Sequence, residues 1–154
     1  MQTFVPFFCR WLHRVALALW LGGLIAIGAL VAPTAFHIIP HNPALAGAVV
    51  GGSLRLFNVL CLACGALMII ADGLLLAMGQ ARRATALGCI ALTLLLLALT
   101  GYLGWSLFPA MDAAQAQNQM SLFDQLHHRY ERLSGLQLPL LLLLAAAATA
   151  RDSA

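Results

Sequence analysis

Four long apolar runs constrain the fold more than any other feature of the sequence. They cover residues 11–32, 54–78, 84–108 and 133–150. A hydrocarbon core about 30 Å thick takes roughly 20 helical residues to cross, and it offers no water to unpaired backbone groups. Hydrophobic residues make up 62% of the chain and charged residues 8%, which is too apolar for a water-soluble domain. The sequence therefore predicts one all-α integral membrane domain over residues 1–154, with four transmembrane helices.

The connections between the runs predict an antiparallel four-helix bundle with up-down topology. A short GQARR turn joins the second and third runs, as is typical of antiparallel neighbours. Pro33, Pro40 and Pro43 are expected to break the chain after the first helix. Residues 121–131 carry an S-x-x-D capping signature and apolar residues at helical spacing, which predicts a short amphipathic helix at the membrane interface. This helix either bends before the last span or runs on into it.

The arginines predict the orientation of the bundle. Cytoplasmic loops carry an excess of basic residues. Five arginines fall at one predicted membrane face and three at the other: Arg10, Arg14, Arg82, Arg83 and Arg151 against Arg55, Arg129 and Arg132. We therefore expect both termini to be cytoplasmic, in what is expected to be a bacterial inner membrane. No basic cluster is dense enough to indicate nucleic-acid binding.

A single carboxylate, Asp72, lies deep in the second apolar run. Ionisable side chains within a membrane face a bundle interior, a partner or a wet cavity. Thr93 lies at a similar depth on the third run, and His13 and Arg14 on the first run start closer to the same face. We expect a buried polar cluster in which Asp72 is bonded to Thr93 or paired with Arg14 or His13. A proton or cation pathway through Asp72 is the alternative.

The other histidines are candidate metal or cofactor ligands. His37 and His41 follow the first run, and His127 and His128 precede the last, so all four are predicted at the extracytoplasmic face. Imidazole is a ligand for copper and zinc, but histidines at a headgroup boundary also serve as plain polar anchors. His13 lies at the opposite face, too far away to share a haem with them. No cofactor is expected, and a haem or copper site is the alternative.

Small residues form a ridge along the first helix. Ala18, Gly22, Ala26 and Ala29 recur at spacings of three and four. Such ridges let neighbouring helix backbones approach closely in membranes. We interpret this ridge as a helix-packing surface, and the four cysteines as small apolar packing residues.

Three segments carry a resemblance to a known family: LWLGGLIAIGALVAPTAF, PALAGAVVGG and LHHRYERLSGL. Together they resemble the DUF4149 family and its animal relatives, the transmembrane protein 205-like proteins. The resemblance implies a four-helix membrane protein without an established enzymatic activity. Arg129, Tyr130, Leu133 and Ser134 match the family pattern before the last helix, whereas Leu138 stands where an asparagine is expected. The first helix alone, with His13 and Trp20, also resembles copper-resistance D-type membrane proteins.

The sequence as a whole favours a small non-catalytic membrane protein that acts as an accessory or packing subunit of a larger assembly. Its expected partners are the lipid bilayer and either other membrane subunits or further copies of itself. No Ser, Cys and His constellation supports nucleophilic catalysis, so we do not expect an enzyme. A haem- or copper-binding protein and a proton-coupled small-solute carrier that uses Asp72 are the alternatives.

Overall fold

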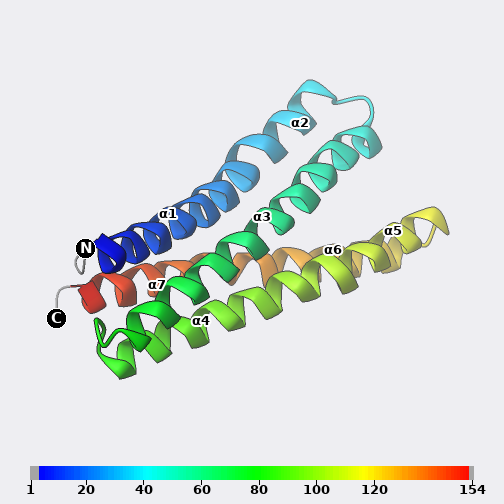
Figure 1. Cartoon of the computed structure of the whole chain (residues 1–154). Helices are drawn as coiled ribbons and strands as arrows, with labels where there is room; N and C mark the ends of the chain where they lie inside the picture. The colour runs from blue at the N-terminus through cyan, green and yellow to red at the C-terminus, as the bar shows by residue number, and fades with distance from the viewer. Residues whose placement is uncertain (1–3, 153–154) are drawn as a thin grey trace.

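The computed structural model describes residues 4–152, and it is helical throughout apart from short turns. The ends of the domain predicted for residues 1–154 lie outside the described residues. Four long helical rods follow one another along the chain, each long and apolar enough to cross a membrane (Figure 1). In chain order, the elements are α1 (Phe4–Ala26), η1 (Ile27–Val31), α2 (Ala32–Ile38), α3 (Pro43–Ala77), α4 (Arg83–Tyr102), η2 (Leu103–Leu107), α5 (Phe108–Ala116), α6 (Met120–Gly135) and α7 (Gln137–Asp152). The predicted all-α class with four membrane-length helices is confirmed.

The rods are longer than the apolar runs, because two of them continue through prolines. Pro33 does not break the first helix as predicted; η1, a π-helical segment, precedes it, and the N–H of Ala32 bonds to the carbonyl of Ile27 five residues back. In the same way, η2 precedes Pro109, and the N–H of Phe108 bonds to the carbonyl of Leu103 five residues back. A proline lacks the N–H that would close an ordinary helical turn. The wider π turn absorbs this defect, and the helix continues.

The two halves of the chain repeat a similar order of elements at an offset of 76 residues, except that α3 is one helix whereas α6 and α7 are separated by a turn. Ile27 at the start of η1 corresponds to Leu103 at the start of η2, and Pro33 corresponds to Pro109. Buried positions follow the same offset, as Trp20 with Leu96 and Met68 with Leu144 show. Each half is a helical hairpin whose outgoing rod contains the π segment. The sequence gives little sign of this repeat, because few paired residues are identical.

The core runs along the centre of the bundle between α1, α3, α4 and α7. Its largest fully buried apolar side chains are Trp20, Met68, Leu96, Leu141 and Leu144. Cys61, Cys64 and Cys89 belong to the same cluster, and Cys9 is buried near one end of the bundle. The cysteines therefore lie where small apolar side chains fill the core.

α6 runs on into α7 with only a turn at Leu136, so the chain adopts the second of the two expected arrangements for residues 121–131. Hydrogen bonds from Leu136 to Arg132 and from Leu140 to Leu136 bridge the turn. The apolar side of α6, at Phe123, Leu126 and Leu133, packs against a second core cluster in η2 and α5. That side is therefore covered by the protein's own helices.

Candidate functional site

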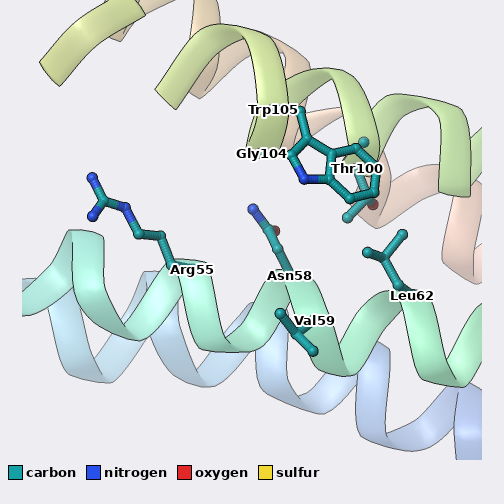
Figure 2. Close-up of a pocket in the computed structure, with 8 residues that line it drawn as sticks. Arg55, Asn58, Val59, Leu62, Thr100, Gly104 and Trp105 are labelled. Atoms are coloured by element: carbon teal, nitrogen blue, oxygen red, sulfur yellow. The ribbon is translucent and has the colours of Figure 1, made fainter. Parts of the chain in front are cut away.

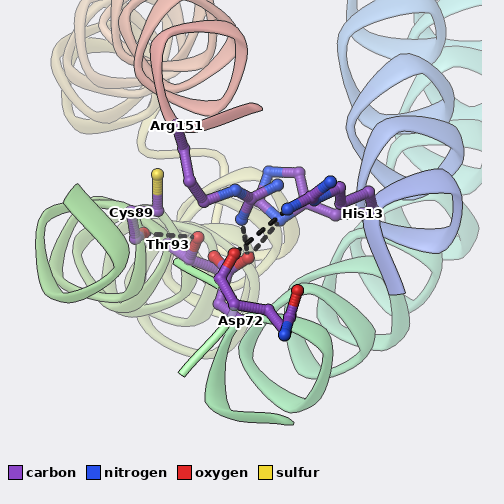
Figure 3. A network of polar contacts seen from close by, with 7 residues as sticks. His13, Asp72, Cys89, Thr93 and Arg151 are labelled. Carbon is purple, nitrogen blue, oxygen red and sulfur yellow. Dashed lines mark hydrogen bonds and ion pairs between the residues drawn. The ribbon is translucent and has the colours of Figure 1, made fainter. Parts of the chain in front are cut away.

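Three buried polar side chains from three different helices meet near one end of the bundle. They are His13 of α1, Asp72 of α3 and Arg151 of α7, and the side chain of each is fully buried. Arg151 Nη1 donates a hydrogen bond to Asp72 Oδ1, and His13 Nδ1 lies 3.0 Å from the same oxygen. Figure 3 shows the Arg151 guanidinium and the His13 ring directed at the single carboxylate. We refer to these three residues as the polar clasp.

Each member of the clasp lies close to a helix end. Asp72 is five residues before the end of α3 at Ala77, or about 7.5 Å at 1.5 Å per residue. Arg151 is in the last turn of α7, where a cation also interacts favourably with the helix dipole. The start of α1 and the end of α7 lie together at this end of the bundle (Figure 1). The clasp therefore joins the first, second and fourth rods near one boundary of the apolar core.

The clasp balances a large desolvation cost against a close ion pair. Removing a charge from water costs several kcal/mol, and a buried partner offsets that cost only with good geometry. His13 Nδ1 is close to Asp72 but forms no hydrogen bond with it, and Asp72 Oδ2 has no hydrogen-bond partner within residues 4–152. The Arg151 contact is therefore the main one, and His13 adds an electrostatic contact beside it.

The structure brings together only part of the predicted polar cluster. His13 and Asp72 are in contact, whereas Thr93 is buried nearby and donates its hydroxyl to the Cys89 carbonyl at 2.9 Å (Figure 3). Arg14 has an exposed side chain. Arg151 was not assigned to this cluster from the sequence, because a basic residue at the end of an apolar run is also what the orientation rule for membrane proteins predicts. Its position at the same predicted face as Asp72 was the available clue.

The four outer histidines lie on the surface. His37 is near the end of α2, His41 is in the turn that follows, and His127 and His128 are on α6, where both pair with Glu131 at 3.3 and 3.1 Å. Among residues 4–152, no group of three or more His, Cys, Asp or Glu side chains is arranged to hold a metal ion. The structure does not gather these histidines into one site.

The small-residue ridge of α1 faces away from the bundle. Ala18, Gly22 and Ala29 are exposed, and Ala26 is partly exposed. A Cβ added at Gly22 would meet no atom within 4 Å, whereas one at the adjacent Gly23 would lie 2.3 Å from the Phe57 ring. Gly23 is thus the glycine that packs within the chain. The ridge itself is not used for packing among the described residues.

The residues that match the family pattern before the last helix have local packing roles. Tyr130 is buried and contacts the Phe108 ring edge-on at 5.0 Å. Arg129 lies over the Tyr102 ring at 5.6 Å, Leu133 packs against the second core cluster, and Ser134 donates to the Glu131 carbonyl. These contacts join α6 to α4 and α5.

The fold and the clasp define the class of the protein: a small all-helical membrane bundle closed near one end by a buried ion pair. Residues 15–120 match the family described as "Domain of unknown function (DUF4149)", and the chain belongs to this family. No curated protein and no solved structure matches the chain.

Proposed function

We propose that the protein is a non-catalytic subunit of a larger membrane assembly and binds its neighbours through the α1 ridge. The observation that carries this proposal is the outward direction of the ridge. Lipid tails are as apolar as leucine side chains, so helices in a membrane associate through close backbone packing rather than through hydrophobicity. Ala18 and Gly22 suit such packing, because both are exposed on one face and a Cβ at Gly22 would meet no atom within 4 Å in the described chain.

We expect Gly22→Leu to weaken this association at least tenfold, because a bulky side chain would hold the neighbouring backbone away. Gly88→Leu is the matched control, since Gly88 is a similarly open glycine on α4. Native mass spectrometry of protein extracted in mild detergent would measure the species present. The wild type and the Gly88 variant should appear in assemblies larger than one chain, and the Gly22 variant as a single chain. A wild type that is always a single chain in nanodiscs contradicts the proposal.

We also propose that the rods cross an inner membrane in up-down order with both termini cytoplasmic. The clasp and Arg55 support this span, because Asp72 and Arg55 are 17 positions apart on α3, or about 25 Å. Single cysteines placed at Gln80 and Gln117, in a variant without the native cysteines, should react with impermeant reagents from opposite sides of the membrane. Labelling of both from the same side would rule out this topology.

The proposed relation to the transmembrane protein 205-like proteins depends on one sequence pattern: Arg129, Tyr130, Leu133 and Ser134. This pattern lies outside the matched residues 15–120. The two residues that make the first helix similar to copper-resistance proteins, His13 and Trp20, both have contacts within this chain. His13 contacts Asp72, and Trp20 Nε1 donates to Gln137 Oε1 at 3.4 Å. Both residues of that likeness therefore have partners inside the bundle.

The two alternative functions have less support than the subunit proposal. A haem or copper protein needs converging ligands, and the outer histidines do not converge within residues 4–152. A carrier centred on Asp72 needs a path to that carboxylate, which is fully buried against Arg151 and His13. An Asp72→Asn variant that abolishes a transport activity while keeping the folded state would favour the carrier.

A further inference from the structure

A cavity of about 200 Å³ with both apolar and polar side chains in its walls lies between α3 and the outgoing rod formed by α4 and η2 (Figure 2). Asn58 extends from α3 toward Gly104 and Trp105, and Arg55 lies one turn away on the same side of α3. Thr100 lines the cavity from α4, and Val59 and Leu62 provide an apolar wall. The cavity is separate from the polar clasp and from the α1 ridge.

The cavity contains two buried polar groups without a hydrogen-bond partner within residues 4–152: the Thr100 hydroxyl and the Asn58 amide nitrogen. Thr100 is 1% exposed. Helical threonines in membranes usually donate to a carbonyl one turn back, and Thr93 and Thr149 do so here. Leaving a buried donor unsatisfied is destabilising, because the group loses its hydrogen bonds to water and gains none in return. Two such donors in one cavity therefore indicate a ligand that accepts hydrogen bonds.

Two glycines keep this cavity open. A Cβ at Gly104 would come within 3.1 Å of Asn58 Nδ2, and one at Gly101 within 3.2 Å of the Trp105 ring. Gly104 and Trp105 belong to η2, and π-helical segments are frequent at functional sites. Side chains at these glycines would displace the Asn58 amide and the Trp105 ring.

Arg55 places a positive charge at one end of the cavity. Its Nη2 donates to Asp112, and its guanidinium lies 5.7 Å from the centre of the Phe108 ring. Both charged side chains are more than half exposed, so this ion pair is weak, and it does not use all five guanidinium N–H donors. Arg55 is thus held in place with donors remaining for an anion.

We propose that this cavity binds the phosphate and ester region of a glycerophospholipid. The phosphate interacts with Arg55, and the ester carbonyl oxygens accept hydrogen bonds from Asn58 and Thr100. These oxygens accept and do not donate, which matches the two unsatisfied donors. The acyl chains lie along Val59, Leu62 and the exposed Trp105. Arg55 is about 25 Å along α3 from the clasp, which places the cavity just inside the opposite boundary of the hydrocarbon core, at the depth of lipid ester groups.

The other half of the chain provides an internal comparison. A second cavity, beside α1 and α6, has Leu24 at the position equivalent to Thr100 and Glu131 at the position equivalent to Arg55. The fold therefore accepts an apolar residue in place of Thr100. Asn58 lines both cavities, and Tyr130 and Ser134 bring hydroxyl groups to the second one. The α3–α4 cavity differs by having Arg55 and Thr100 where the other half has Glu131 and Leu24, so these two residues are not a requirement of the repeated architecture.

The test is native mass spectrometry of lipid-depleted protein titrated with three probes: phosphatidylglycerol, diacylglycerol with the same acyl chains, and inorganic phosphate. We expect one tightly bound phosphatidylglycerol per chain, with at least tenfold weaker binding of the other two probes. Thr100→Val and Asn58→Leu should each weaken phosphatidylglycerol binding about tenfold, as expected for one lost hydrogen bond. Arg55→Gln should reduce it to the level of diacylglycerol. Ser134→Ala, at the position equivalent to Asn58, should leave it unchanged.

A second measurement separates ligand binding from a structural role. Because Thr100→Val removes an unsatisfied donor at nearly constant volume, the lipid-free variant should melt at the same or a higher temperature than the wild type. The proposal is overturned if the valine variant melts lower and binds phosphatidylglycerol normally, or if Arg55→Gln has no effect on binding. Equal binding of inorganic phosphate would assign the site to free phosphate and would also overturn it.

Discussion

Asp72→Ala is expected to lower the free energy of unfolding of the bundle by roughly 3–5 kcal/mol, because the substitution leaves a buried arginine without its counter-charge. Arg151 and Asp72 are both fully buried in their pair, so water cannot replace the lost partner without opening the helix ends. Equilibrium unfolding in mixed detergent micelles, followed by circular dichroism, measures the change. Asp124→Ala, at an exposed position on α6, is the control and should change stability by less than about 0.5 kcal/mol.

A combined replacement tests whether the charges themselves are required. Changing His13 and Asp72 to leucine and Arg151 to methionine should recover most of the stability lost in Asp72→Ala, because apolar residues of similar volume often replace buried ion pairs without loss. Asp72→Ala and Arg151→Ala should also be strongly non-additive in a double-mutant cycle, since they remove the same interaction. Additive effects in that cycle, or an Asp72→Ala variant as stable as the wild type, would show that the clasp does not hold the helices together.

The apolar runs were sufficient to predict the fold class, because a membrane leaves a chain few other ways to satisfy its backbone. They were not sufficient to predict the helix ends. Pro33 predicts a break when the sequence is read alone, because a proline lacks the N–H that closes a helical turn. In the folded bundle, the π-helical segments η1 and η2 precede Pro33 and Pro109, and the rods continue to Ile38 and Ala116.

The sequence predicts that a polar cluster surrounds Asp72, but it does not predict all the residues that form the cluster. A carboxylate at the depth of Asp72 requires a partner, so the existence of a cluster follows from solvation alone. Which cation reaches it depends on how the rods rotate about their axes and on which ends meet. His13 and Arg14 are adjacent in the sequence and point in different directions on α1, so only His13 faces inward. Arg151 is 79 positions from Asp72, and only the assembled bundle places it there.

For the small residues too, the sequence does not show which ones pack inside the chain. The sequence places Gly22 and Gly23 side by side, and either could face another helix. Phe57 occupies the space beside Gly23, whereas no atom lies within 4 Å of a Cβ at Gly22. Helical spacing identifies a ridge, but the rotation of α1 decides whether that ridge is used inside the chain or offered to a partner.

Gly65 lies in a tight contact between α3 and α4, and we expect Gly65→Val to destabilise the bundle by roughly 1–3 kcal/mol through overpacking. A Cβ at this position would lie 2.4 Å from Leu97 Cδ2 and 2.8 Å from Leu97 Cγ, so a rotation of the leucine tip alone cannot make room. The helices would have to separate. The same unfolding measurement applies, with Gly73→Val as the control because Gly73 is an open glycine on the same helix.

Leu97→Ala should rescue the Gly65 variant, because the double change moves three carbon atoms from α4 to α3 and nearly conserves the volume between them. Leu97→Ala alone should itself be destabilising, since it leaves a cavity beside Gly65. The double variant should therefore be more stable than the sum of the two single losses predicts. If the two losses simply add, the clash is not the cause.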